Sequence, residues 1–138
     1  MTKSDDLLTQ LVTEYGLLDG SAARLRLLAE RCIALEISGT AVRSVDDALR
    51  LHVADSLAGL ELEAIRQAGT LVDIGTGVGF PGIVLALALP ELRVTLLDSV
   101  RKKVEAAAAL YDELELTNVE CVWSRVEQFS ACLLYTSP

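Results

Sequence analysis

Residues suited to metal or redox chemistry are scarce in this chain of 138 residues. There is one histidine, His52, and the three cysteines, Cys32, Cys121 and Cys132, lie far apart. Metal binding or thiol redox chemistry usually needs cysteines in close pairs or with histidine partners. We therefore expect no metal site and interpret the cysteines as buried or half-buried thiols.

Long apolar runs and a leader sequence are also missing. No apolar stretch is long and uncharged enough to span a bilayer. The start of the chain, residues 1–6, is polar and acidic, which is unlike a secretory signal. We expect a cytoplasmic protein with no membrane partner.

Basic residues are outnumbered, with 12 Lys and Arg against 20 Asp and Glu, and the net charge is −8. A protein that grips a nucleic-acid backbone usually has a basic face. Three explanations of this acidic charge remain open, and in the first two the protein still acts on RNA. The basic contacts lie outside this chain, the substrate is a ribonucleoprotein surface, or RNA is not the substrate.

Apolar residues make up 51% of the chain, enough for a core, and the first 66 residues have a helical pattern. Ser21 is a candidate cap for a second helix and Ser44 for a third. Asp47 follows Ser44 by three residues, which is a capping-box pattern. The three expected helices carry their apolar residues over 7–15, 25–35 and 45–57.

From residue 70 the pattern alternates between strands and helices, which is typical of a parallel sheet with right-handed crossovers. We predict an α/β fold, the first half of a Rossmann-like domain over 67–130, after a helical N-terminal region over 1–66. The further strands of such a sheet are absent, and we interpret 131–138 as a non-native tail. The expected strands are 71–74, 93–98 and 119–123, and the expected helices between them are 83–89 and 101–116.

A glycine cluster follows the first strand, where open parallel sheets bind nucleotide-like ligands. Gly77, Gly79 and Gly82 have the G-x-G-x-x-G spacing of dinucleotide-binding proteins. The carboxylate of Asp73, just before the glycines, instead suits a cationic ligand such as the amino-acid part of S-adenosylmethionine. Pro81 also lacks an N–H that a pyrophosphate would use. NAD and S-adenosylmethionine both remain open from these residues alone.

Asp98 ends the second predicted strand, 19 residues beyond Gly79. A carboxylate at this place accepts hydrogen bonds from ribose hydroxyls, and both ligands contain a ribose. The alternative is that Asp98 caps the helix that starts at Arg101. We expect ribose binding.

The chain resembles the glucose-inhibited division protein B family in three blocks of sequence, LVDIGTGVGFPGI, VTLLDSVRKKV and SRVEQF. Upstream, HVADSL is similar to a stretch of the helical region of that family. Members are small-subunit ribosomal RNA methyltransferases that form 7-methylguanosine. The resemblance covers residues 52–129. It departs at residues 37–40, where Ile-Ser-Gly-Thr stands in place of the usual Asn-Leu-Thr run.

The resemblance implies an S-adenosylmethionine-dependent methyltransferase acting on ribosomal RNA or the small ribosomal subunit, and we expect a monomer. It implies that Gly75 and Phe80 contact the cofactor, that Asp98 holds the ribose, and that Val126 and Glu127 lie against the adenine. The complete predicted cofactor site is Asp73, Gly75, Gly77, Gly79, Phe80, Asp98, Val126 and Glu127.

No catalytic acid or base is predicted, because attack by a guanine ring nitrogen on a sulfonium methyl depends mostly on positioning. His52 and Asp55 lie about one helical turn apart, and we expect them to tie the helical region to the sheet rather than to shuttle a proton. Trp123 is expected in the core. Two other classes remain: an NAD-dependent oxidoreductase and an inactive fragment.

Overall fold

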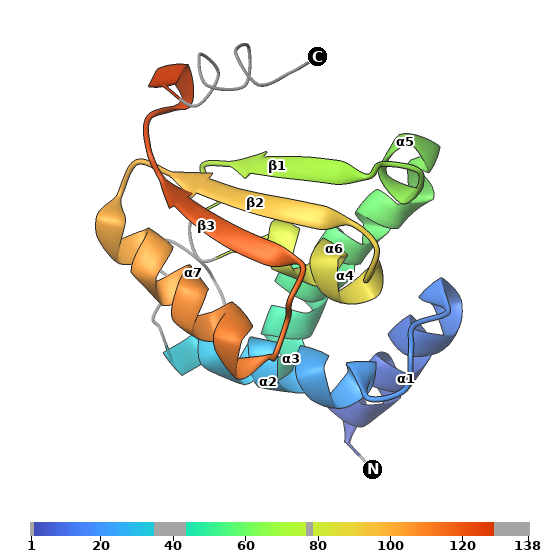
Figure 1. Cartoon of the computed structure of the whole chain (residues 1–138). Coiled ribbons are helices and arrows are strands. Elements are labelled where there is room, and N and C mark those ends of the chain that lie inside the picture. Colours follow the sequence, from blue (N-terminus) through green and yellow to red (C-terminus); the bar gives the residue numbers. More distant parts are fainter. Residues whose placement is uncertain (1, 35–43, 77–78, 129–138) are drawn as a thin grey trace.

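The computed structural model describes residues 2–34, 44–76 and 79–128. Five short or medium helices precede a region in which strands and helices alternate (Figure 1). The helices are α1 (Lys3–Tyr15), α2 (Ser21–Ala34), α3 (Val45–Ala48), α4 (Ala54–Leu57), α5 (Glu63–Arg66), α6 (Gly82–Ala88) and α7 (Arg101–Glu113). The strands are β1 (Thr70–Ile74), β2 (Arg93–Asp98) and β3 (Val119–Trp123).

Local side-chain bonds explain where α1 begins and ends. The hydroxyl of Thr2 accepts the N–H of Asp5 at 3.1 Å, and the Asp5 carboxylate accepts the N–H of Thr2 at 3.0 Å. This reciprocal pair satisfies two of the free donors at the helix start. Gly16, with φ 61°, ends the helix in the left-handed conformation that favours glycine.

The two predicted caps, Ser21 and Ser44, have different outcomes. Ser44 caps α3, since its hydroxyl accepts the N–H of Asp47 at 3.1 Å. The prediction that Ser21 caps α2 is wrong, because Ser21 is itself the first residue of the helix and is buried. Gly20 takes the capping place, and its carbonyl accepts the N–H of Arg24 at 3.2 Å.

The third predicted helix is also less regular than its sequence pattern indicates. α3 and α4 are joined by a π-helical turn, Leu49–Val53, and a 3₁₀ turn, Ala58–Glu61, follows α4. Apolar residues on this segment, among them Leu49, Val53 and Leu57, are fully buried. The π-helical turn adds a residue to one helical turn without moving these side chains out of the core.

The three strands form one parallel sheet in the order β1-β2-β3. Ile74 pairs with Leu97, and Leu97 pairs with Val122, so the carboxyl ends of the strands lie along the same edge. The predicted bounds of β2 and β3 agree with the structure, and β1 begins one residue earlier than predicted. The parallel sheet confirms the predicted α/β class.

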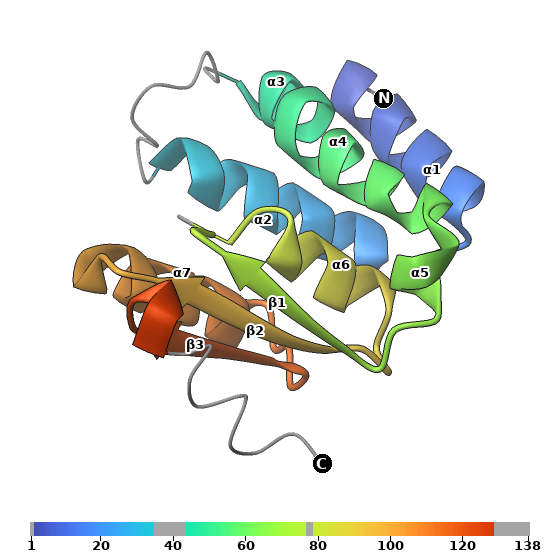
Figure 2. The ribbon, with the colours of Figure 1, turned by 90° about the horizontal axis from the view of Figure 1, so that it is seen from above.

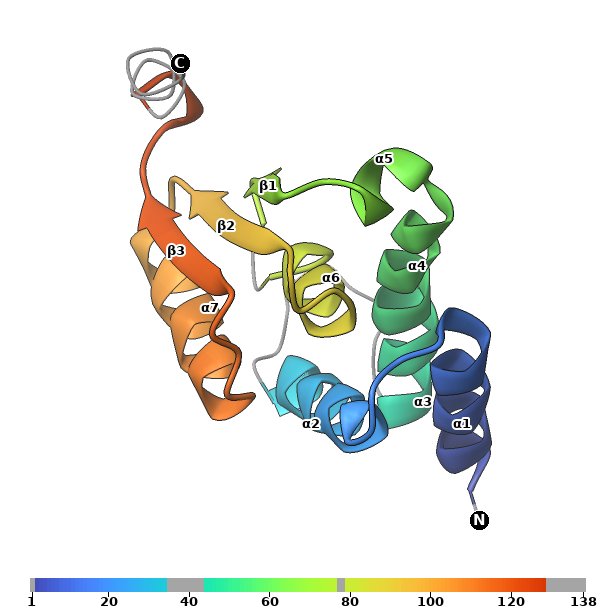
Figure 3. The same ribbon diagram turned by 45° about the vertical axis from the view of Figure 1, so that its right-hand side comes forward.

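The helices α1–α4, α6 and α7 lie on the same side of the sheet (Figures 1 and 3). On that side Leu96 of β2 and the apolar residues of α6 join the helical region in one continuous core. On the opposite side no helix of the described residues covers the sheet (Figure 2). Val72 and Ile74 on that side are 37% and 60% exposed.

Within the described ranges, no helix combines the length and the apolar character needed to cross a membrane.

The cysteines within the described residues are thiols, as expected. Cys32 is buried and Cys121 is half-buried. Burial raises the pKa of the Cys32 thiol to about 11, so this thiol is protonated and unreactive at neutral pH. Cys132 and the predicted tail, 131–138, lie outside the described residues.

Asn118 connects the amino ends of β2 and β3 to the end of α6. Its amide nitrogen Nδ2 donates to the carbonyl oxygens of Ala86, Leu89 and Leu92 at 3.0, 3.2 and 2.8 Å. The carbonyl of Leu89 also accepts the N–H of Leu92 at 2.9 Å. The last carbonyls of a helix have no partner within the helix, so the Asn118 side chain supplies a donor at the end of α6.

We expect Asn118→Ala to lower the free energy of unfolding by about 1–3 kcal/mol, because the carbonyls of Ala86 and Leu92 lose this donor and that of Leu89 keeps only the N–H of Leu92. Gln67→Ala is the matched control, since Gln67 also donates an amide bond but on an exposed helix surface, and it should cost less than about 0.5 kcal/mol. Urea unfolding measures both, and equal effects would contradict the role of Asn118.

Candidate functional site

The carboxylate of Asp73 closes the glycine loop onto the sheet. Its Oδ2 atom accepts the hydroxyl of Thr76 at 2.8 Å and the backbone N–H of Gly82 at 2.9 Å. A Cβ atom on Gly82 would lie 2.4 Å from Leu96 Cδ2 and 2.9 Å from Asp73 Oδ2. The start of α6 is therefore held against β1 and β2 at a distance that only glycine permits.

Burial raises the pKa of Asp73 above its ordinary value of 3.8. The bonds from Thr76 and Gly82 act in the opposite direction, and the nearby charge of Asp98 raises the pKa further. Two carboxylates thus interact across the ends of β1 and β2. An approaching cation would be stabilised by both.

Two glycines of the loop have left-handed backbone conformations. Gly75 has φ 69°, and a Cβ atom there would meet no atom within 4 Å. Gly79 has φ 113°, and a Cβ atom there would lie 2.3 Å from Ile83 Cδ1. Gly75 therefore leaves open space beside the backbone, whereas Gly79 allows close packing on α6. Gly77 lies outside the described residues.

Backbone hydrogen bonds align the segments that follow the three strands. The N–H of Gly75 donates to the carbonyl of Leu97 at 2.8 Å, and the N–H of Ser124 donates to the carbonyl of Asp98 at 3.1 Å. The glycine loop, Asp98 and the segment after β3 therefore lie next to one another. Open parallel sheets bind ligands at this edge.

Asp98 is 7% exposed. Its Oδ1 accepts the N–H of Val100, the residue that caps α7, at 2.9 Å. This bond goes to the residue before α7 and not to an N–H of the first turn of the helix, so the capping role considered from the sequence stays a prediction, as does the ribose contact.

The remaining predicted site residues come from two sides of this edge. Val126 and Glu127 are exposed and follow β3. Phe80 is half-buried, and its ring stacks on the ring of His52 with centroids 5.1 Å apart and an interplanar angle of 24°. His52 thus links the helical region to the glycine loop that follows β1, which is the kind of structural tie expected of it, although Phe80 was not predicted as its partner.

The expectation that Trp123 lies in the core is wrong. Its side chain is 58% exposed, because β3 is an outer strand of the sheet. The indole N–H donates to the carbonyl of Ser99 at 3.0 Å, and the guanidinium of Arg101 lies 5.4 Å from the ring centroid. The ring is held in a fixed orientation at the same edge as Asp98.

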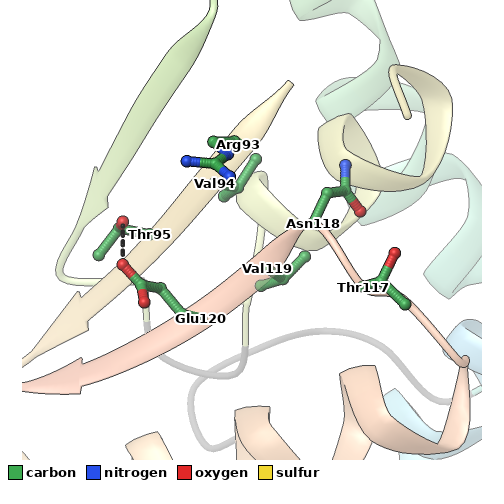
Figure 4. A pocket seen from close by; sticks show the side chains of 7 residues that line it. All are labelled: Arg93, Val94, Thr95, Thr117, Asn118, Val119 and Glu120. Atoms are coloured by element: carbon green, nitrogen blue, oxygen red, sulfur yellow. Dashed lines mark hydrogen bonds between the residues drawn. The ribbon is translucent and has the colours of Figure 1, made fainter. Parts of the chain in front are cut away.

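A cleft of about 310 Å³ lies at the amino ends of β2 and β3 (Figure 4). Its polar side chains already bond within the fold, since Thr95 donates to Glu120 at 3.2 Å and Asn118 bonds the end of α6. This cleft is at the opposite ends of the strands from the glycine loop. The carboxyl edge is therefore the better candidate for a ligand site.

A parallel sheet with a glycine loop after β1 and an acid at the end of β2 is an arrangement typical of nucleoside-binding α/β folds. A solved protein-L-isoaspartate O-methyltransferase shares the fold with a TM-score of 0.54 and 18% identity, covering 87% of this chain and 41% of that chain. The fold is thus that of a methyltransferase.

The sequence model of the rRNA small subunit methyltransferase G family matches residues 17–135, and the chain belongs to this family. The ribosomal RNA small subunit methyltransferase G of Methylobacillus flagellatus is 44% identical over 90 residues, covering 65% of this chain and 42% of that protein. The corresponding protein of Alkaliphilus metalliredigens is 37% identical over 107 residues, covering 75% and 45%. The chain thus spans less than half the length of these relatives.

These findings confirm the resemblance seen in the sequence. Both relatives and the solved structure are named as methyltransferases, and none of them is named as an oxidoreductase. The NAD-dependent alternative therefore has no support from these comparisons.

The pKa of Asp73 leads to a prediction about stability. A carboxyl with a raised pKa in the folded state binds its proton more tightly there than when unfolded. Its stabilising contribution is present below pH 3.8 and is lost as the pH rises through the raised value. In Asp73→Asn one amide oxygen accepts both bonds from Thr76 and Gly82, and the titrating group is gone.

We therefore expect the stability of Asp73→Asn, relative to the natural chain, to increase as the pH rises from about 3 and then to level off. Urea unfolding between about pH 3 and 7 measures this difference. Asp112→Asn, which changes an exposed carboxylate on α7, is the control. A difference that is constant or of opposite slope would contradict the burial of an unneutralised charge at Asp73.

Proposed function

We propose that the protein of which this chain is part transfers a methyl group from S-adenosylmethionine to a guanine of small-subunit ribosomal RNA, forming 7-methylguanosine. Family membership supports this substrate. The observation that carries the cofactor is the alignment of the glycine loop, Asp98 and the segment after β3 at one edge. A ribosomal substrate implies the cytoplasm as the place of action.

In this proposal each part of the edge holds one part of the cofactor. Asp73 keeps the loop closed and faces the cationic amino-acid end. Asp98 accepts the ribose hydroxyls. The loop glycines admit the cofactor against the backbone, and larger side chains line the rest. The glycines are Gly75, Gly77 and Gly79, and the lining side chains are Phe80, Val126 and Glu127.

S-adenosylmethionine supplies a methyl group bonded to a positively charged sulfur. The acceptor nitrogen of guanine has a lone pair and carries no proton, so no side chain has to act as a base. The chain's contribution is to hold the two reactants in line and close together.

Exposed basic residues lie beside the same edge despite the acidic total charge. Arg101, Lys102 and Lys103 form the first turn of α7, and the first turn contains no acid. Arg101 forms an ion pair with Glu105 of the same helix at 3.0 Å. Cations at a helix N-terminus oppose the helix dipole, so helix stability does not explain Lys102 and Lys103. Contact with RNA phosphates next to the cofactor site would explain these cations.

The cofactor assignment is tested by equilibrium dialysis with S-adenosylhomocysteine. Asp98→Ala should weaken binding by about 1–3 kcal/mol, roughly 5- to 150-fold in Kd, because the ribose bonds are lost. Asp98→Asn keeps one acceptor oxygen in place of two, and should lose less. Unchanged affinity in Asp98→Ala, or tighter binding of NAD than of S-adenosylhomocysteine, would contradict the assignment.

Lys102→Ala combined with Lys103→Ala should weaken binding of small-subunit ribosomal RNA and reduce the slope of log K against log salt by up to about 1–2 units. Filter binding over a salt series gives this slope. The affinity for S-adenosylhomocysteine should stay unchanged, and the melting temperature should not fall, because both changes remove cations that oppose the helix dipole. An unchanged slope would exclude these lysines from the RNA contact.

A further inference from the structure

A cleft of about 260 Å³ separates the helical region from the glycine loop. His52 and Asp55 line it from the segment that joins α3 to α4, and Phe80 lines it from the loop. Ile65 and Leu85 supply apolar wall. Sites for drug-sized ligands measure about 300–1,000 Å³, so this volume suits a single planar heterocycle.

Among the residues that line this cleft, His52 carries a buried polar atom without a partner. Its Nε2 atom is buried and forms no hydrogen bond, and the described residues leave it without a partner. Burying such a group without a bond is unfavourable unless a ligand completes it. His52 also sits in the π-helical turn, Leu49–Val53, and turns of this kind frequently occur at functional sites.

The carboxylate of Asp55 determines which hydrogen-bond donors a ligand in this cleft must present. Its side chain is exposed and lines the cleft three residues after His52. An ionised carboxylate only accepts hydrogen bonds, and it binds two parallel donors best. Among the RNA bases, guanine alone presents two adjacent donors, N1–H and N2–H, on one edge. The guanine O6 atom next to them is an acceptor for an imidazole N–H.

We propose that this cleft holds the guanine base that accepts the methyl group, with Asp55 on N1–H and N2–H and His52 Nε2–H on O6. The proposal rests on the proposed function. Because Phe80 belongs to both the cleft wall and the glycine loop, a base in the cleft lies next to the cofactor edge. The N7 lone pair forms the bond to the methyl carbon, and the carbon–sulfur bond breaks with its electron pair going to sulfur. The guanine leaves as a cation, and no proton moves.

The single histidine of the chain makes a direct test possible. Its ring signals in a nitrogen-correlated NMR spectrum belong to His52 without further assignment. Guanosine 5′-monophosphate is titrated into the chain, with and without saturating S-adenosylhomocysteine, and adenosine 5′-monophosphate is the comparison. We expect a saturable shift of the His52 ring signals with the guanine nucleotide and roughly tenfold or weaker binding of the adenine nucleotide.

Asp55→Asn should reduce guanine nucleotide affinity to about that of the adenine nucleotide, and Asp112→Asn is the matched control. Both variants should bind S-adenosylhomocysteine as the natural chain does, by calorimetry. Equal shifts with both nucleotides, or no shift, would overturn the proposal. So would a loss of S-adenosylhomocysteine affinity in Asp55→Asn, because the cleft would then belong to the cofactor. Failure of the natural chain to bind S-adenosylhomocysteine would instead count against the proposed function, and the titration without it still tests the cleft.

Discussion

The two hydrogen bonds accepted by Asp73 Oδ2 hold the site together. One bond fixes Thr76 within the loop, and the other fixes the first residue of α6, so the loop has to turn back over the end of β1. That turn places Gly75 beside the end of β2, where its N–H extends the bonding of the sheet. These bonds leave the half-buried carboxylate of Asp73 without a positively charged partner, which favours the binding of a cation there.

The sheet supports this edge although only one of its faces is covered by described helices. Three parallel strands are sufficient to align the glycine loop, Asp98 and the segment after β3. On the other face Ile74, Leu97 and Val122 pair across the strands. The outer residue Ile74 is 60% exposed, whereas the central Leu97 is 1% exposed. Within the described ranges the outer edge of β1 is also unpaired. The relatives are more than twice as long as the part matched by this chain, so the carboxyl edge of the sheet corresponds to a part that makes up less than half of their length.

Much of this fold could be predicted from the sequence, because the responsible interactions are local. Runs of Val, Thr and Leu defined β2, and the uninterrupted apolar stretch after Pro81 defined α6. The π-helical turn at Leu49–Val53 was missed, since one extra residue in a turn hardly changes apolar spacing. Trp123 was misplaced because its pattern does not reveal that β3 is an outer strand. The stacking of His52 on Phe80 joins residues far apart in the chain, and only the packing of α4 on α6 reveals it.

The central claim is that a nucleoside cofactor binds at the carboxyl edge of the sheet. Backbone amide NMR signals recorded with and without S-adenosylhomocysteine test it directly. The account predicts that the largest shifts fall on Gly75, Gly79, Phe80, Asp98 and Val126. Shifts centred on the cleft at the amino ends, at Thr95 and Glu120, or no saturable shifts in a folded chain, would contradict it.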